Sequence, residues 1–241
     1  MAGSDLPLAD ELAQLAARMS PLLLSADTVS AAVETLTSLT QESVARATGA
    51  GVSLMDAQGT RTSTGATSAV VVTADDAQYR LDEGPCLTAW AERRVVRIDD
   101  VGTDERWPQW AEAVRSLPVG SVVSAPLVTR GLALGAVKVY SEAAGAFDER
   151  TERLLTGFAE MAAVLLANVV SLDNERRLSA GLQKALQDRD TLQLAKGVVM
   201  QRDGVSEQTA FRSLVTEAGA GRRSLQELAA SIVGTTTRPS D

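Results

Sequence analysis

One cysteine and two tryptophans are the residues in the N-terminal part of the chain whose types could do chemistry. Cys86 lies in LDEGPCLTAW (81–90), and Trp107 and Trp110 stand three positions apart around a proline in DERWPQWAEA (104–113). A thiol reacts when its pKa is lowered, whereas a buried cysteine only packs. Paired indoles either cap a core or wall a small-molecule pocket. We therefore treat all three as candidate ligand-binding residues, with packing as the alternative.

The chain has no histidine among its 241 residues. This absence excludes the Ser-His-Asp and Cys-His arrangements, His-ligated haem, the usual zinc sites and a phospho-accepting histidine. No P-loop or GxGxxG pattern offers a phosphate cradle. We therefore expect no catalysis, no metal and no cofactor.

Basic residues are concentrated towards the C-terminus of an acidic chain. The net charge is −8, and residues 1–182 hold 15 Lys and Arg against 24 Asp and Glu. Residues 183–241 hold 8 against 7. An acidic chain does not attract nucleic acid broadly, but a mildly positive segment permits local contacts with phosphates.

The stretch AKGVVMQRDGVSEQTAFRSL (195–214) carries the candidate contacts of that segment. Arg189 and Lys196 are seven positions apart and share one helix face. Gly197 inside a helix costs about 1 kcal/mol relative to Ala, so either helices cross closely there or a ligand backbone approaches it. An ordinary charged face is the alternative for the basic residues. Three arginines complete the candidate set: Arg212, Arg222 and Arg223.

The apolar spacing predicts an α+β domain followed by an all-helical region. We expect one helix over 4–24 and a second that is capped by Asp27 and ends at about Thr48. Two strands with a turn at 56–59 are expected within 51–65, and further strands over 68–73 and 95–100. The remaining expected elements are helices over 78–82, 85–93 and 108–117 and a hairpin of strands 121–128 and 132–141. Helices around antiparallel strands are typical of α+β folds.

From Asp148 the chain is predicted to be helical almost without a break. Leu178, Leu182, Ala185, Arg189, Leu192, Lys196 and Val199 alternate by four and three. The apolar run 161–172, followed by this seam, predicts a homodimer joined through residues 158–192, with the N-terminal helix as an optional further contact. The coiled coil is expected to be of moderate strength, because charged residues occupy two positions of the seam. Ser206 and Ser224 cap two further helices. Their bundle core is expected to hold Ala210, Phe211, Leu214, Leu225, Leu228 and Ile232.

Three segments together resemble a GAF domain over roughly residues 28–170. They are LDEGPCLTAW, VVRIDDVGTDERWPQWAEAV and SVVSAPLVTRGLALGAVKVYSEAAGAFDE. The resemblance implies a small-molecule or partner sensor with a central antiparallel sheet flanked by helices. The NKFDE-type signature of cyclic-nucleotide sites and the Cys-His site of bilin binders are both missing, so neither ligand is expected.

Residues 182–233, LQKALQDRDTLQLAKGVVMQRDGVSEQTAFRSLVTEAGAGRRSLQELAASIV, resemble an ANTAR domain. The resemblance implies a three-helix, RNA-binding output module of transcription antiterminators. It implies binding to a pair of small stem-loops in a nascent leader transcript, with Arg189, Lys196, Gly197, Arg212, Arg222 and Arg223 as RNA contacts. The Gly-rich turn at 218–221 and the double arginine after it depart from the family pattern.

We therefore expect a cytoplasmic, homodimeric antitermination regulator. No signal peptide is evident, and the most apolar run, 161–172, is too short to span a membrane. The competing hypothesis is a redox or small-molecule sensor whose C-terminal bundle binds a protein partner. The expected parts are an N-terminal helix (1–27), a GAF-like domain (28–170), a helical linker (171–181), an ANTAR-like domain (182–234) and a disordered tail (235–241).

Overall fold

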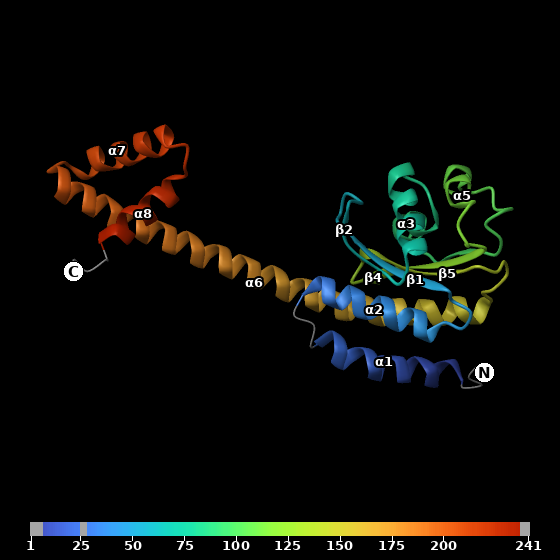
Figure 1. The fold of residues 1–241 in the computed structure, drawn as a ribbon. Helices are drawn as coiled ribbons and strands as arrows, with labels where there is room; N and C mark the ends of the chain where they lie inside the picture. Colours follow the sequence, from blue (N-terminus) through green and yellow to red (C-terminus); the bar gives the residue numbers. More distant parts are fainter. Residues whose placement is uncertain (1–6, 25–27, 237–241) are drawn as a thin grey trace. The chain divides into compact units, whose positions relative to one another are not determined.

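The computed structural model describes residues 7–24 and 28–236 (Figure 1). The predicted cap at Asp27 and most of the predicted tail therefore lie outside the described residues. The helices are α1 (Leu8–Leu24), α2 (Val29–Ser43), α3 (Ala69–Leu81), α4 (Pro85–Glu92), α5 (Pro108–Val114), α6 (Glu149–Asp203), α7 (Glu207–Ala220) and α8 (Leu225–Thr236). The strands are β1 (Gly49–Met55), β2 (Arg61–Ala66), β3 (Val96–Ile98), β4 (Ser121–Thr129) and β5 (Leu132–Ser141).

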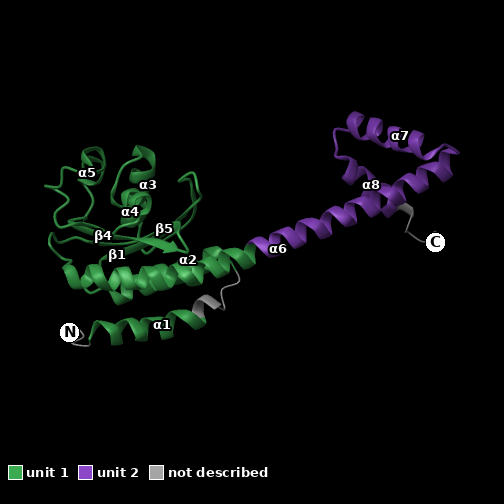
Figure 2. Cartoon of the chain, turned by 180° about the vertical axis from the view of Figure 1, so that it is seen from behind, with its two compact units in different colours: residues 1–173 green, residues 174–241 purple. Residues whose placement is uncertain are grey.

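The chain divides into two compact units, residues 1–173 and 174–241 (Figure 2). The first unit contains one five-stranded antiparallel sheet within its described residues, in the order β2-β1-β5-β4-β3. The hairpin of β4 and β5 and the turn between β1 and β2 confirm the predicted α+β class. Every residue of β1 is buried, which shows that this strand is covered on both faces.

Helices cover the two faces of the sheet in different ways (Figure 1). On one face α2 and the first part of α6 pack against β1, β4 and β5, and α1 lies outside that helical layer. On the other face α3, α4 and α5 build a second core that contains Trp107 and Trp110. Two cores around one sheet are what a domain of packed layers requires.

The prediction of a strand over residues 68–73 is wrong, because the segment begins α3. Ser68 is the N-cap, and its Oγ accepts a hydrogen bond from the backbone N–H of Val71. Val71 and Ala74 then face the second core, so capping and packing outweigh the strand preference of a valine-rich run. A smaller correction concerns α2, whose N-cap is Thr28 and whose last residue is Ser43.

Helix α6 runs without a break through Gly181. By length and composition it is the one helix in the described part of the chain that could cross a membrane. The core helix of a soluble protein passes the same test, and Leu155, Phe158 and Leu166 are buried against the sheet in the first unit. Packing therefore accounts for the apolar character of this segment.

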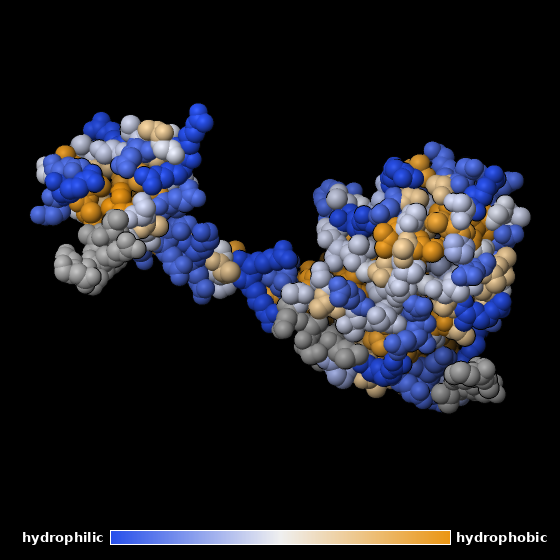
Figure 3. Space-filling model, viewed as in Figure 1, coloured by the Kyte–Doolittle hydropathy of each residue, from blue (hydrophilic) through white to orange (hydrophobic). Residues whose placement is uncertain are grey.

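The end of α6, with α7 and α8, forms the core of the second unit. Ala195, Val199, Leu214 and Leu228 are buried there, and Figure 3 shows apolar atoms between helices whose outer surfaces are largely hydrophilic. Ser206 caps α7, and at the start of α8 the side chains of Ser224 and Glu227 each accept a hydrogen bond from the other residue's backbone N–H. The three-helix arrangement thus agrees with the sequence pattern.

Candidate nucleic-acid interface

A shallow hollow of about 470 Å³ lies between α6 and α7 in the second unit. We call it the α6–α7 hollow, and its lining residues are Leu192, Gln193, Lys196, Glu207, Gln208 and Phe211. The lining combines one cation, one anion, two amides and one aromatic ring. These groups can pair with the edge and the face of a nucleic-acid base.

Lys196 is held at the hollow by an ion pair. Its side chain is only 11% exposed, and its Nζ donates a hydrogen bond of 2.5 Å to Oε1 of Glu207, which is 64% exposed. This hydrogen bond and the charge of Lys196 lower the pKa of Glu207 below its usual value. The lysine therefore does not stand free on a charged face. A ligand in the hollow therefore meets Lys196 either as part of the ion pair or after Lys196 has given up its bond to Glu207.

Phe211 is not a core residue, and that prediction is wrong. Ala210 and Leu214 fill the core, and each step along a helix turns the side chain by about 100°. Phe211 lies one step from Ala210, at the edge of the core-facing side of α7. Its side chain is 40% exposed and lines the hollow. An exposed ring beside polar groups is the kind of surface on which unpaired RNA bases stack.

Gly197 does not mark a close helix crossing. A Cβ built on this residue meets no heavy atom within 4 Å among the described residues. The residue follows Gln193 by one helical turn, so the two share a face of α6. Open space at Gly197 leaves room for the second explanation, the approach of a ligand, which stays a prediction.

The four candidate arginines lie outside the lining of the hollow. Arg189 pairs with Asp190 at 3.2 Å, and Arg223 pairs with Glu217 at 3.4 Å. Arg212 is exposed on α7, and Arg222 has a φ of 52° in the turn before α8. Contact between these arginines and RNA stays a prediction. The sequence reasoning missed the lining residues Gln193, Glu207 and Gln208, although an i, i+4 spacing relates Gln193 to Gly197 and Gln208 to Arg212.

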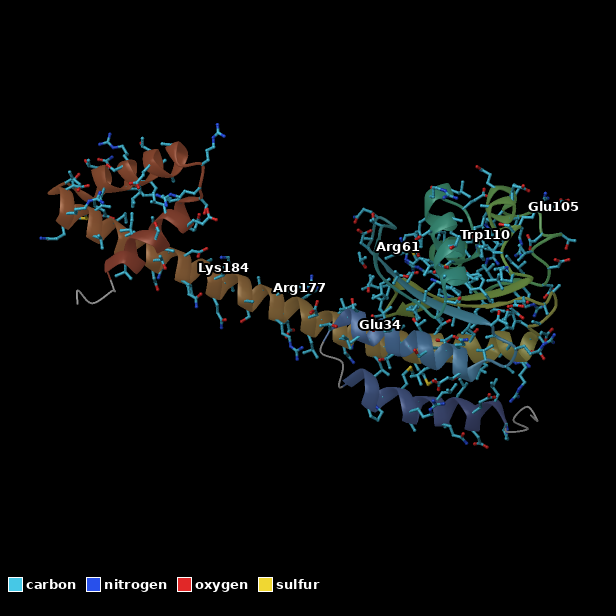
Figure 4. The ribbon with its side chains drawn as sticks, viewed as in Figure 1. Glu34, Arg61, Glu105, Trp110, Arg177 and Lys184 are labelled. Atoms are coloured by element: carbon cyan, nitrogen blue, oxygen red, sulfur yellow. The ribbon has the colours of Figure 1, made fainter. Side chains whose placement is uncertain are left out.

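The candidate ligand residues of the first unit have different surroundings. Cys86 is 1% exposed, and burial raises the pKa of its thiol although Lys138 opposes this shift. Trp110 is also 1% exposed, and its Nε1 donates to the carbonyl oxygen of Ala74; Figure 4 shows it in the layer of helices above the sheet. Trp107 lines a separate hollow of about 330 Å³.

A buried ion pair that the sequence reasoning missed lies near Cys86. Nζ of Lys138 is 2.6 Å from Oδ2 of Asp75 and donates to Oγ of Ser53, and the hydroxyl of Tyr140 donates to Oδ1 of Asp75. Burial alone would lower the pKa of Lys138, but the Asp75 carboxylate raises it. A lysine between two valines in a strand covered on both faces was a signal that an acidic partner exists.

The GAF domain family model matches residues 26–167 of the chain, and the ANTAR domain family model matches residues 180–233. No curated protein matches the chain by sequence. The residues between the two matches, 168–179, contain the boundary between the compact units.

Solved structures resemble the first unit in fold. Free methionine-R-sulfoxide reductase from Neisseria meningitidis, in complex with its substrate, is 16% identical with a TM-score of 0.52, over 71% of this chain and 98% of the reductase. The GAF domain of a phosphoenolpyruvate-protein phosphotransferase from Acinetobacter is 12% identical with a TM-score of 0.51, over 68% of this chain and 97% of that domain. At these identities the likeness shows a shared fold alone.

Proposed function

The chain belongs to the GAF domain family and carries an ANTAR domain behind its GAF domain, and from this premise we propose that it is an RNA-binding regulator of transcription antitermination. The GAF domain takes the sensing role, and the ANTAR domain binds stem-loops in a nascent transcript. The protein then acts in the cytoplasm, where such transcripts are made. Binding would keep the RNA from forming a terminator hairpin.

The observation that carries this proposal is the α6–α7 hollow. Its exposed Phe211 offers a ring face, and the amides of Gln193 and Gln208 offer donors and acceptors. Proteins that read RNA sequence usually bind loops, whose unpaired bases stack on such rings. The weak positive charge of residues 183–241 suits a small, local contact with phosphates better than a broad electrostatic one.

We further propose that two copies associate through α6. Leu178, Leu182 and Leu186 lie at steps of four and are 66%, 59% and 52% exposed. Helices in proteins gain most of their stability from packing of an apolar face, and a second copy would cover these leucines with its own. Phe158 is buried in the core and is therefore not part of the proposed interface, whereas Val164 and Leu172 of α6 are both exposed.

We propose a regulatory rather than a catalytic role for the GAF domain. Its fold is shared with a sulfoxide reductase, but thiol chemistry needs an accessible cysteine with a lowered pKa. Cys86 is buried, and its pKa is raised. These two properties favour packing as the role of Cys86 over redox sensing.

The test is to cross-link the full-length protein to RNA in cells and sequence the bound RNA. A stem-loop pair from the recovered set then serves to measure affinity at two salt concentrations. Binding through phosphates weakens as salt rises. We expect Lys196→Ala and Arg212→Ala to lower affinity by about 1–3 kcal/mol, whereas Lys184→Ala on the exposed part of α6 (Figure 4) removes the same charge without effect.

If no structured RNA is recovered and none binds, the RNA proposal fails, and a protein partner becomes the occupant of the three-helix unit. If RNA binds equally well to Lys196→Ala and Lys184→Ala, the RNA lies elsewhere on the chain.

A further inference from the structure

The GAF domain has a hollow of about 330 Å³ on the side of the sheet that α3, α4 and α5 cover. We call it the indole hollow. The turn between β1 and β2, the loop between α3 and α4, the outer side of α4 and Trp107 form its walls. Its volume is at the lower end of the range for small-molecule sites. The lining residues that matter here are Asp82, Glu83, Leu87, Trp90, Glu92 and Trp107.

Both indoles of the hollow are held in place. Nε1 of Trp90 donates to the carbonyl oxygen of Ala133 at 3.1 Å, and Nε1 of Trp107 donates to Oγ1 of Thr88 at 3.1 Å. Gly59, with a φ of +82°, packs so closely on the ring of Trp90 that a built Cβ would lie 3.1 Å from it. The aromatic walls are therefore formed before any ligand arrives.

The charged side chains that line the hollow are all acidic. Three carboxylates line it, and none of the described lining residues is a lysine or an arginine. Asp82 makes no ion pair within the described part of the chain. Glu83 accepts hydrogen bonds from the backbone N–H of Trp110 and from Nε2 of Gln109, which are neutral donors. Glu92 is the one whose charge is balanced, by Arg94.

One cation already uses an indole of this hollow. The guanidinium of Arg106 lies 4.5 Å from the centre of the Trp107 ring. Tryptophan is the aromatic side chain that attracts cations best, and the attraction increases when water is excluded. A hydrated metal ion would gain little from indoles and leucine, an anion would be repelled, and a neutral ligand would leave the charge of Asp82 without a partner.

We propose that the indole hollow binds a small alkylammonium cation, with its carbon groups against Trp90, Trp107 and Leu87 and its charge near Asp82 and Glu83. The binding stands on these contacts alone. Its role as the signal that the GAF domain senses rests on the proposed function.

Choline is the probe, because its neutral carbon isostere, 3,3-dimethyl-1-butanol, has the same shape without the charge. The full-length protein is titrated with choline at constant ionic strength, and binding is measured by calorimetry and by tryptophan fluorescence. Both measurements should show saturable binding of choline. The isostere should bind at least about fivefold more weakly.

Asp82→Asn removes one charge and keeps the fold, because Asp82 is exposed in a left-handed conformation that asparagine also adopts. This variant should weaken choline binding at least about threefold and leave the isostere unaffected. The matched control is Glu34→Gln, which removes an exposed acid from α2 on the opposite face of the sheet (Figure 4).

Equal binding of choline and the isostere, unchanged choline affinity in Asp82→Asn, or no binding of choline would each overturn the proposal. RNA affinity is measured separately on the same protein, so a failure here is distinct from a failure of the RNA-binding proposal.

Discussion

Replacement of Gly197 by alanine separates folding from RNA binding in one substitution. The added methyl group meets no described atom within 4 Å, so it costs no packing in the free protein. Gly197 lies inside α6, where alanine is favoured over glycine by about 1 kcal/mol. The substitution should therefore stabilise the end of α6 and the helices packed on it.

The same methyl group occupies the open space beside the α6–α7 hollow. If an RNA backbone approaches there, the methyl group forces it away, and overpacking of a close contact costs about 1–3 kcal/mol. We therefore expect RNA affinity to fall by about fivefold to 150-fold while the protein becomes more stable. A gain in stability with a loss of binding is a result that a folding defect cannot produce.

Hydrogen exchange of the full-length protein measures the first effect, as about fivefold slower exchange in the three-helix unit. Fluorescence anisotropy with a two-stem-loop RNA measures the second. Gly181→Ala is the control, because its Cβ also meets open space on α6 but lies outside the three-helix core. Unchanged RNA affinity in Gly197→Ala would refute the close approach of RNA at this residue.

Three further predictions follow from charges and exposed leucines. Lys196 lowers the pKa of Glu207, so the stabilisation of the three-helix unit by this ion pair is fully present above about pH 4.5. This stabilisation is lost as the pH falls through the lowered pKa of Glu207. Circular dichroism melts should show an acid-induced loss of stability that is smaller in Glu207→Gln. Asp75→Ala leaves Lys138 buried without a partner and should cost about 3–5 kcal/mol in chemical unfolding, part of which Lys138→Met in the same chain recovers; a cost below about 1 kcal/mol would contradict this. Leu182→Asp should shift the protein from dimer to monomer in analytical ultracentrifugation, and a wild-type protein that is monomeric at micromolar concentration would reject the dimer.

Local patterns predicted the elements whose signals are repeated along the chain. The hairpin of β4 and β5 follows from two apolar runs around TRG, and α6 follows from a long segment without proline. The error at residues 68–73 arose because a run of valines favours a strand. In the structure the N-cap at Ser68 and the burial of Val71 in the second core stabilise a helix instead. A cap and a tertiary contact outweighed propensity.

The sites depend on contacts between distant residues, which a single sequence does not reveal. Lys138 and Asp75 are far apart in sequence and meet only because α3 covers the sheet beside β5. Phe211 is apolar and adjacent to a core alanine, so its sequence position does not distinguish a core residue from an exposed ring. The structure supplies this distinction and moves Phe211 from the core to the α6–α7 hollow.

The affinity of Phe211→Ala for a two-stem-loop RNA tests the central claim most directly. Because Phe211 is 40% exposed, its removal should change the stability of the protein far less than the 3–5 kcal/mol of a core phenylalanine. Loss of base stacking should still lower RNA affinity by about 1–3 kcal/mol. Phe211→Tyr keeps the ring and should therefore keep most of the wild-type affinity. If the folded Phe211→Ala variant binds the RNA as tightly as the wild type, the α6–α7 hollow is not the RNA interface.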